Sequence, residues 1–461
     1  RTLGKHTGIG ALLAAMLYNR AHTLPCIYEL ETLPDWFVTD YVSYMTNPAL
    51  LFCKPGEPVK YFQHMTRWMD YLHSAIRANP TADFWLKIAS LVVQRADFGP
   101  LYFTSSNPKQ LYRQRGEIID HALRASGHNL DYEVPPHTDG KPLRTGIISL
   151  HCRPSPETFA MLPVFEHHAD EDEVILYLLH ADNQALEQYC AQRAGTLKIL
   201  PGDPDSQAAI IRADNLDVLF FATNITSACN PVCLLAAHRL ARTQIVGTGS
   251  VTTTGMQHID YYMTGTATDS PQNAAHYSEQ LLWLDGPAHC FSYGPDNEHT
   301  TTRIARADLG IADDAIVYVS GANMLKIVPE LMMLWARLLG KQDNSVLMLY
   351  PYGPNWSNSY PKTLFRQRLL SVLATQGVKA ERLLLLDPDP VPDRHQIREY
   401  LGIADIYLDS HPFSGTTSFI EPLQVGLPIV CRSGMNFRSS MGAALLKSIQ
   451  LHELVADDDE K

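Results

Sequence analysis

The chain has 461 residues, of which 45% are hydrophobic and 19% charged, and its formal net charge at pH 7 is −12. This globular composition excludes a largely disordered protein, and the length is sufficient for two or three domains with their own cores. The acidic balance disfavours a broad phosphate-binding surface, so we expect no nucleic-acid or anionic-membrane partner, whereas a local basic pocket for one nucleotide remains compatible with it.

The cysteines and the N-terminal segment predict neither a metal site nor a membrane anchor. The closest cysteine pair, Cys229 and Cys233, has no second His or Cys doublet to complete a zinc pattern, so we expect free buried thiols in a reducing, cytoplasmic compartment and no metal. No apolar run approaches the roughly 20 residues of a membrane span. The run 9–17 is similar to part of a signal peptide, but Asn19 and Arg20 continue the helical pattern, so we expect a buried helix.

Residues 1–140 predict an all-α domain. Aromatic and aliphatic side chains recur at helical spacing in the segments 35–45 and 59–76, and stretches that contain Pro separate the helices at 47–58 and 77–83. There is no self-similarity at a period of roughly 34 residues, so a repeat solenoid is not expected.

Residues 141–298 predict a first Rossmann-like domain. Short apolar runs that alternate with helices are typical of a parallel sheet with helices on both faces. Strands are expected at 143–151, 173–180, 216–223 and 243–249, and a helix at 156–168. The less regular stretch 269–299 is expected to cross into a second unit.

Residues 299–461 predict a second unit of the same α/β kind. Strands are expected at 315–321, 345–353, 381–388, 405–410 and 427–434, and helices at 329–340, 395–404 and 418–426. Two tandem units create a cleft at the carboxyl ends of the strands, where open α/β sheets bind their ligands. Two-Rossmann glycosyltransferases have this layout, but other enzymes share it.

The segment 405–431 contains the most informative candidate site. A predicted strand ends at Asp409, and a loop of small residues leads into a helix that is expected to begin near Ser418. Free N–H groups at a helix start attract phosphate, hydroxyls add donors, and a glycine permits close approach of the backbone. The expected phosphate contacts in this turn are Gly415, Thr416, Thr417 and Ser418. Glu421, about one turn later, suits a ribose diol, although Ser418 and Glu421 also fit a capping box with no binding role.

Two further side chains of the second unit are candidates. Lys326 follows a predicted strand and precedes Pro329, an expected first-turn residue, so its ammonium can face the cleft and neutralise a leaving diphosphate. The alternative is a solvated loop lysine. His395 opens a predicted helix at the edge of the sheet, where it can contact a base or only cap the helix.

In the first unit, His151 ends the opening strand and faces the same cleft. It is a candidate general base or a contact to the donor phosphate, and a purely structural histidine is the alternative. The polar loop 247–262 is expected to form a wall of the acceptor cleft. The acidic segments 387–389 and 457–459 do not stand where a metal-binding doublet is expected.

Six segments between residues 141 and 456, taken in order, resemble family 41 of the glycosyltransferases. They are RLARTQIVGTG, TTTGMQHIDYY, YSEQLLWL, NMLKIVPELMMLWARLL, ADIYLDSHPFSGTTSFIEPLQVGLPIVC and GAALLKSIQLHELVA. This family comprises the protein O-GlcNAc transferases, the plant SPINDLY proteins and the bacterial adhesin-modifying N-glycosyltransferases. The resemblance implies a GT-B-like pair of Rossmann-like domains, with the acceptor on the side of the first and the nucleotide sugar bound by the second.

Two branches of the family share features with the chain. The loop 415–417 and the C-terminal tail are similar to the O-GlcNAc transferase and SPINDLY branch. The non-repeat helical domain, its segment 90–119 and the spacing from His395 to Glu421 resemble the bacterial, cytoplasmic N-glycosyltransferase branch, which we favour. The chain ends soon after ELVA, where relatives continue with further helices, so the second domain is expected to be truncated.

The resemblance also implies residue roles. Lys326 corresponds to the donor-phosphate lysine, Thr417 to a phosphate contact, Glu421 to a position near the ribose, and His395 to a histidine close to the nucleotide. The chain departs from the pattern elsewhere.

The usual histidine after the first strand of the N-terminal unit falls near Ser155, and His151 is displaced from it. Thr416 replaces the histidine of the O-GlcNAc transferase loop, and the loop 247–262 is two residues longer than its counterpart in O-GlcNAc transferases. These departures leave the catalytic base and the donor open.

The expected function is therefore an inverting, metal-independent transfer of a hexose from a nucleotide sugar to a protein or peptide, with UDP-glucose as donor and Asn in Asn-x-Ser/Thr as acceptor. O-GlcNAc or O-fucosyl transfer to Ser/Thr is the first alternative. A catalytically silent scaffold of the same fold and a small-molecule transferase or epimerase with two Rossmann units are the others.

Overall fold

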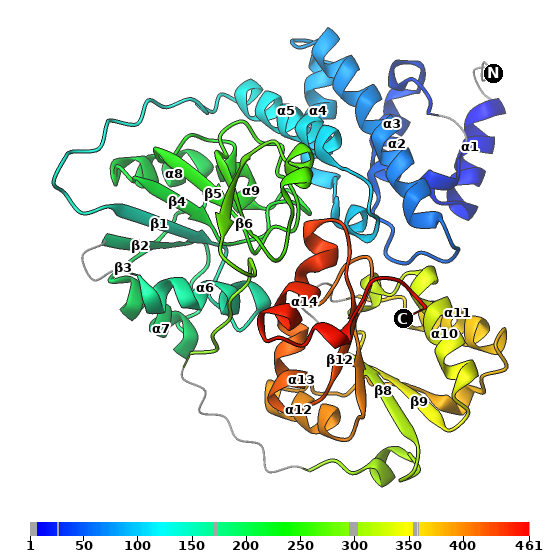
Figure 1. Ribbon diagram of the computed structural model, residues 1–461. Helices are drawn as coiled ribbons and strands as arrows, with labels where there is room; N and C mark the ends of the chain where they lie inside the picture. Colours follow the sequence, from blue (N-terminus) through cyan, green and yellow to red (C-terminus); the bar gives the residue numbers. More distant parts are fainter. Residues whose placement is uncertain are drawn as a thin grey trace.

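The computed structural model describes residues 7–24, 27–168, 173–294, 303–353, 357 and 359–460. The chain forms a helical N-terminal region followed by two parallel β-sheets, each flanked by helices (Figure 1). This arrangement confirms the predicted α/β fold, in which two Rossmann-like units follow an all-α part.

Five α-helices build the N-terminal region. They are α1 (Thr7–Tyr18), α2 (Asp35–Thr46), α3 (Glu57–Ala78), α4 (Asp83–Arg95) and α5 (Lys109–Ala125). Along α3 the buried side chains Tyr61, Met65 and Trp68 recur every three or four residues, so that one stripe of the helix faces the core. The helices α2 and α3 confirm the helical spacing predicted for 35–45 and 59–76.

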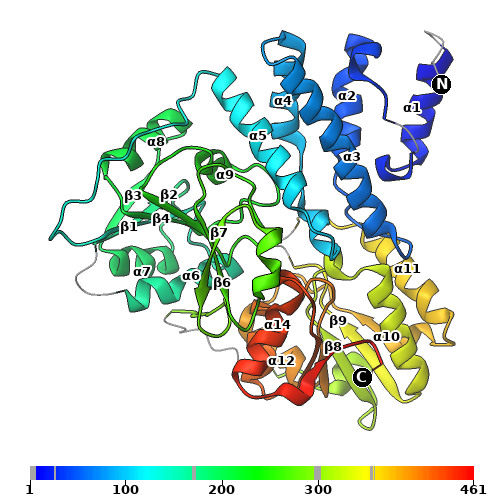
Figure 2. The same ribbon diagram turned by 45° about the horizontal axis from the view of Figure 1, so that its top comes forward.

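Helix α1 is not the buried helix that the sequence predicts. Leu12 is 5% exposed, but Tyr18 is 88% exposed and Leu17 is also largely exposed. The helix lies at the outer edge of the N-terminal region (Figure 2), so only one side of it can contact the rest of the chain. An apolar run in a helix at the edge of a bundle is therefore compatible with wide exposure.

The first sheet has seven parallel strands in the order β3-β2-β1-β4-β5-β6-β7. They are β1 (Arg144–Ser149), β2 (Glu173–Leu178), β3 (Thr196–Ile199), β4 (Val218–Phe221), β5 (Thr243–Val246), β6 (Tyr261–Gly265) and β7 (Gln280–Leu284). The flanking α-helices are α6 (Pro156–His167), α7 (Ala185–Ala194), α8 (Pro204–Ala213) and α9 (Pro231–Ala236). Ile147 and Ile148 of β1 enter different buried clusters, as expected of a strand covered on both faces.

The four strands predicted for the first unit are confirmed as β1, β2, β4 and β5, whereas β3, β6 and β7 were not predicted. The strands β3 and β7 are the two edges of the sheet, and most of their side chains are at least partly exposed. Strand β3 lacks an apolar run, whereas the apolar run 281–284 of β7 lies in the stretch 269–299, which was expected to be less regular. Strand β6 begins inside the segment 247–262, which the sequence assigned entirely to a loop.

The second sheet has six parallel strands in the order β10-β9-β8-β11-β12-β13. They are β8 (Ile316–Ser320), β9 (Ser345–Leu349), β10 (Leu383–Leu385), β11 (Ile406–Leu408), β12 (Ile429–Arg432) and β13 (Val455–Ala456). The flanking α-helices are α10 (Pro329–Lys341), α11 (Lys362–Ala374), α12 (Arg394–Gly402), α13 (Ile420–Gln424) and α14 (Phe437–Ser448).

The helix predicted for 418–426 is shorter than expected. The 3-10 helix η8 (Thr417–Phe419) comes first, and the five-residue helix α13 follows it. Pro422 has no N–H to donate to the carbonyl oxygen of Ser418, so α-helical bonding cannot extend back to that residue. The turn consequently provides hydroxyls and loop backbone rather than the start of a long helix.

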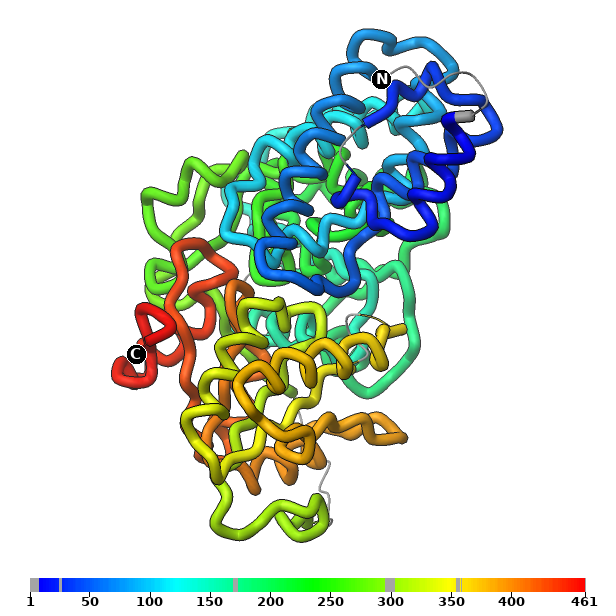
Figure 3. Tube along the Cα trace, turned by 90° about the vertical axis from the view of Figure 1, so that its right-hand side faces the viewer, coloured from blue at the N-terminus to red at the C-terminus, as the bar shows by residue number. Residues whose placement is uncertain are grey.

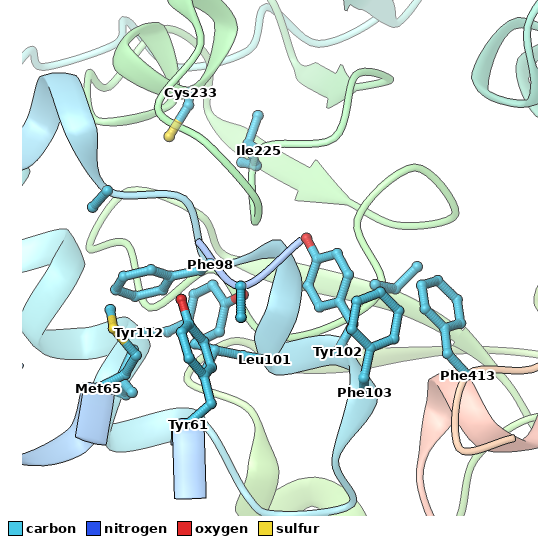
Figure 4. Close-up of a cluster of buried hydrophobic side chains, with 14 of the residues drawn as sticks. Tyr61, Met65, Phe98, Leu101, Tyr102, Phe103, Tyr112, Ile225, Cys233 and Phe413 are labelled. Atoms are coloured by element: carbon cyan, nitrogen blue, oxygen red, sulfur yellow. The ribbon is translucent and has the colours of Figure 1, made fainter. Parts of the chain in front are cut away.

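A short 3-10 helix, η3 (Gly99–Phe103), joins the N-terminal region to both sheet-bearing units. The Tyr102 hydroxyl bonds to Thr226 Oγ1 of the first unit at 2.7 Å, and the Phe413 ring of the second unit packs on Tyr102 and Phe103 (Figure 4). Arg438 of α14 donates from Nε to the Tyr102 carbonyl oxygen at 2.9 Å. A single core cluster therefore runs through all three parts, and Figure 3 shows the N-terminal helices stacked on the rest of the chain.

Candidate functional site

A cavity of about 1010 Å³ lies between the two sheets, and residues from all three parts of the chain line it. His151 and Asn224 follow strands β1 and β4 of the first sheet, while Lys326 and Thr417 follow β8 and β11 of the second. The cavity therefore opens at the carboxyl ends of both sets of strands, where open α/β sheets bind their ligands. Its volume is at the upper end of the roughly 300–1,000 Å³ of small-molecule sites.

Lys326 lies in the 3-10 helix η6 (Met324–Lys326), between β8 and α10. Pro329 is the first residue of α10, as predicted, which fixes the chain direction just after the lysine. The Lys326 ammonium donates to the Ser414 carbonyl oxygen at 3.0 Å and lies 4.0 Å from the centre of the Phe413 ring. Burial lowers the pKa of Lys326 to about 8, and the nearby Asp409 charge opposes that shift. The group therefore remains mainly protonated at neutral pH.

Asp409, at the carboxyl end of β11, shapes the loop that holds Lys326. Its carboxylate accepts a hydrogen bond from the Gly415 N–H at 2.7 Å and another from the Ser414 hydroxyl. The Ser414 oxygen in turn accepts from the Gly442 N–H at 3.0 Å, which ties the loop to α14. Burial raises the pKa of Asp409 to about 6, while these hydrogen bonds act in the opposite direction. The loop is thus fixed by buried polar contacts before any ligand binds.

Glu421 lines the cavity and belongs to a cluster that bridges the two units. Its Oε1 accepts from the Tyr293 hydroxyl at 3.1 Å and lies 3.5 Å from Arg394 Nε. The Arg394 guanidinium stacks on the Tyr293 ring at 3.3 Å from its centre. Burial raises the pKa of Glu421 above its ordinary value. Ser418 and Glu421 do not form the capping box that was considered for them, because Ser418 lies inside η8 and is not the residue that caps a helix.

On the opposite wall, His151 lies two residues after β1 and is partly buried. Burial lowers its pKa below the ordinary value, with the Arg153 charge as a second cause. Its imidazole is therefore neutral near pH 7 and able to accept a proton. Ser155, where the resemblance places a histidine, accepts the Thr158 N–H and starts α6.

Sequence reasoning missed Glu157 of the same wall. It lies in the first turn of α6 and lines the cavity, and its Oε1 accepts from the Asn224 N–H at 3.2 Å. Burial raises the pKa of this carboxyl group. An acidic residue in the first helical turn after a strand is the signal that would have identified it, because such a turn lies at the carboxyl edge of the sheet.

The structure brings most of the predicted site residues to one cavity. Those that line it are His151, Lys326, Thr416, Thr417, Ser418 and Glu421. The loop 247–262 contributes Thr248, Gly249 and Val251, in agreement with the predicted cleft wall. Lys326 and the turn at Ser418 therefore line the same cavity.

Gly415 and His395 are not among the lining residues. A Cβ at Gly415 would lie 2.5 Å from Ser418 Oγ and 2.7 Å from the Phe419 ring, so this glycine permits close packing within the chain rather than close approach of a ligand. His395 contacts Arg398. The residues of α12 that line the cavity are Ile397, Tyr400 and Leu401, which lie on the opposite side of a 3.6-residue helix from position 395. Asp393, not His395, caps this helix.

Within the part of the chain that the structure describes, the one group that could hold a metal ion lies away from the cavity. Among the described residues, three His, Cys, Asp or Glu side chains approach one another closely enough to hold an ion at one place, formed by His128, Asp205 and His238, and none of these lines the cavity. Within the same residues, no helix has the length and apolarity to cross a membrane.

Comparison with known proteins gives a family match in the second unit. Residues 287–461 match the model of Glycosyl transferase family 41. The chain is 27% identical over 366 residues to a probable UDP-N-acetylglucosamine–peptide N-acetylglucosaminyltransferase SPINDLY of Hordeum vulgare, an alignment that covers 78% of this chain and 37% of that protein. It is 27% identical over 299 residues to the SEC protein of Arabidopsis thaliana, also named as a probable enzyme of this kind, with 63% and 29% covered. The chain thus spans well under half the length of these relatives.

A solved structure supports the fold over the whole chain. A mutant O-GlcNAc transferase of Thermobaculum terrenum superposes with a TM-score of 0.63 at 20% identity and covers 100% of this chain and 89% of its own. The helical region and both Rossmann-like units therefore have counterparts in a chain of known structure.

Proposed function

We propose that the chain is a member of glycosyltransferase family 41, whose model matches residues 287–461, and that it transfers a sugar from a UDP-sugar to a side chain of a protein. The observation that supports this most directly is the convergence of Lys326 and the turn 416–418 on one cavity between the two sheets. A nucleoside diphosphate requires a cation and several hydrogen-bond donors at the place where its charge grows as the sugar leaves. The lysine ammonium, the hydroxyls of Thr416, Thr417 and Ser418 and the loop N–H groups provide them.

The proposed reaction is a single displacement with inversion and no metal. An acceptor oxygen or nitrogen attacks the anomeric carbon, the bond from that carbon to the diphosphate oxygen breaks, and the acceptor proton passes to His151. Lys326 stabilises the negative charge that develops on UDP, an interaction of the kind worth about 3–4 kcal/mol in other enzymes. Binding of both substrates in one cavity would supply the remaining advantage through proximity.

We propose UDP-N-acetylglucosamine as the first donor to test, with Ser or Thr of a peptide as acceptor. The plant relatives are named for UDP-N-acetylglucosamine and peptide, and the superposed bacterial structure is named an O-GlcNAc transferase. The size of the cavity accommodates a nucleotide sugar together with an acceptor side chain.

The second candidate is transfer of glucose from UDP-glucose to Asn in Asn-x-Ser/Thr. One observation favours it: residues 97–103 of the non-repeat helical region contribute Asp97, Gly99, Tyr102 and Phe103 to the wall of the cavity. These residues belong to the segment 90–119 that resembles the bacterial N-glycosyltransferase branch. A helical region that touches the acceptor side provides a reason for acceptor choice to differ from that of the plant relatives.

The test is a panel of donors and acceptors read by mass spectrometry. UDP-N-acetylglucosamine, UDP-glucose and GDP-fucose are each incubated with peptides that contain either Ser/Thr or Asn-x-Ser/Thr, with and without EDTA. Transfer from either UDP-sugar that persists in EDTA and is abolished in Lys326→Met supports the proposal. Absence of both transfer and UDP binding would instead favour a silent scaffold, and transfer only from GDP-fucose would overturn the assignment of the nucleotide.

A further inference from the structure

Three side chains that are distant in the sequence meet where the N-terminal region joins the first sheet. His128 follows α5, Asp205 lies in the first turn of α8, and His238 lies just after α9. One ligand atom from each of the three lies within 4.8 Å of the other two. His128 Nδ1 is 2.7 Å from Asp205 Oδ1, and the two imidazole rings meet edge to face with centres 5.9 Å apart.

His238 has a buried nitrogen with no hydrogen-bond partner. The side chain is 0% exposed, and its Nδ1 is 3.1 Å from the Leu234 carbonyl oxygen, which fixes the proton on Nδ1. Its Nε2 therefore carries a lone pair, yet no described group donates to it. Buried polar atoms normally have partners, so this one requires an explanation.

The surroundings suit a cation that enters from solvent. The Asp205 side chain is 69% exposed and supplies negative charge, whereas His128 lies between the exposed carboxylate and the buried imidazole. The guanidinium of Arg212, a cation of the neighbouring helix end, donates to the carbonyl oxygens of Arg239 and Asn129 at 3.0 Å each.

We propose that His128, Asp205 and His238 bind one zinc ion. Two imidazole nitrogens and one carboxylate oxygen form a ligand set typical of zinc, with a water molecule in the fourth position of a tetrahedral site. Calcium and magnesium prefer oxygen ligands throughout and fit this set poorly. The ion would satisfy the His238 nitrogen and fasten the end of α5 to α8 and α9. This inference is independent of the proposed transferase activity.

The test uses the full chain after removal of bound metal, titrated with Zn²⁺ alone. We expect one ion to bind with a dissociation constant below about 10 µM and to raise the melting temperature. His128→Ala and Asp205→Ala change partly exposed residues and should fold normally, yet each should weaken binding at least about tenfold. His137→Gln is the matched control. His137 lies on the same connecting segment as His128 but pairs with Asp217, so its substitution leaves the three ligands unchanged.

Cobalt substitution identifies the ligands independently of stability. Co²⁺ in the proposed site should show visible d–d bands without the near-ultraviolet charge-transfer band of a cobalt–thiolate bond, because no cysteine belongs to the site. A thiolate band, an unchanged zinc stoichiometry and affinity in both His128→Ala and Asp205→Ala, or no zinc binding at about 1 mM would each overturn the proposal.

Discussion

Gly442 packs against the loop that holds Lys326, and this close contact leaves no room for a side chain at position 442. A Cβ at this position of α14 would be 2.5 Å from Ser414 Oγ and 2.6 Å from the Phe419 ring. Both neighbours are fully buried, so neither can move into solvent. Gly442→Ala must therefore displace the loop or the helix, and the Ser414 carbonyl oxygen that accepts from Lys326 moves with the loop.

The expected cost follows from this overpacking. Insertion of extra volume into a well-packed core destabilises by about 1–3 kcal/mol. For a folding unit of 150–250 residues each kcal/mol lowers the melting temperature by about 2–4 °C, so we expect a decrease of roughly 2–12 °C. The affinity for UDP should decrease as well, by about tenfold or more, since the proposed diphosphate contacts depend on the loop.

Thermal unfolding and calorimetric titration with UDP measure the two effects. Gly402→Ala is the matched control: Gly402 is the last residue of α12, a Cβ there meets nothing within 4 Å, and its φ is not positive. The control should keep the wild-type melting temperature and affinity. If Gly442→Ala behaves like the control in both measurements, the rigid packing that we infer around Ser414 is wrong.

Three further predictions follow from the cavity and its supports. Because Lys326 is charged below its pKa of about 8, UDP binding should be strong at pH 7 and weaken as the pH rises through 8 to 9, whereas Lys326→Met should remove this dependence. Tyr102→Phe should lower the free energy of unfolding by about 1–2 kcal/mol in urea titrations, because it removes the buried hydrogen bond to Thr226. An unchanged free energy of unfolding would show that this hydrogen bond contributes nothing to stability. His151→Gln should lower kcat by about 100-fold with little change in the donor KM. Glu157→Gln should lower kcat by less than about tenfold, since the Glu157 carboxylate is already hydrogen bonded to Asn224. If Glu157→Gln has the larger effect, Glu157 and not His151 is the base.

Buried strands with a continuous apolar run are easier to predict from this sequence than short or partly exposed strands. The buried strands β2, β8 and β11 are recognisable because apolar residues run almost continuously along them. The edge strands β3 and β7 were not predicted, because Lys198 interrupts the apolar residues of β3 and the apolar run of β7 lies in the less regular stretch 269–299. The exposure of α1 could not be predicted, because composition does not reveal which face of a helix finds a partner.

The residues of the candidate site were also predicted only in part. Lys326 and Thr417 were identified because each follows a strand end, and strand ends of parallel sheets meet at one edge. His395 was placed at the site by its position near a helix start, but its place on the helix turns it away from the lining face. Glu157 was overlooked because the sequence does not show that the fold brings its carboxylate to the backbone of Asn224 and to the wall of the cavity.

The most direct test of the account is calorimetric titration of the full chain with UDP, in the wild type and in Lys326→Met. An ammonium at about 4 Å from a phosphate charge contributes about 4 kcal/mol at an effective dielectric constant of about 20, so we predict at least about 100-fold weaker binding in the variant. Lys362→Met is the control, because Lys362 pairs with Asp387 and does not line the cavity. Equal UDP affinity in the wild type and in Lys326→Met, or no UDP binding by the wild type, would contradict the proposed diphosphate site.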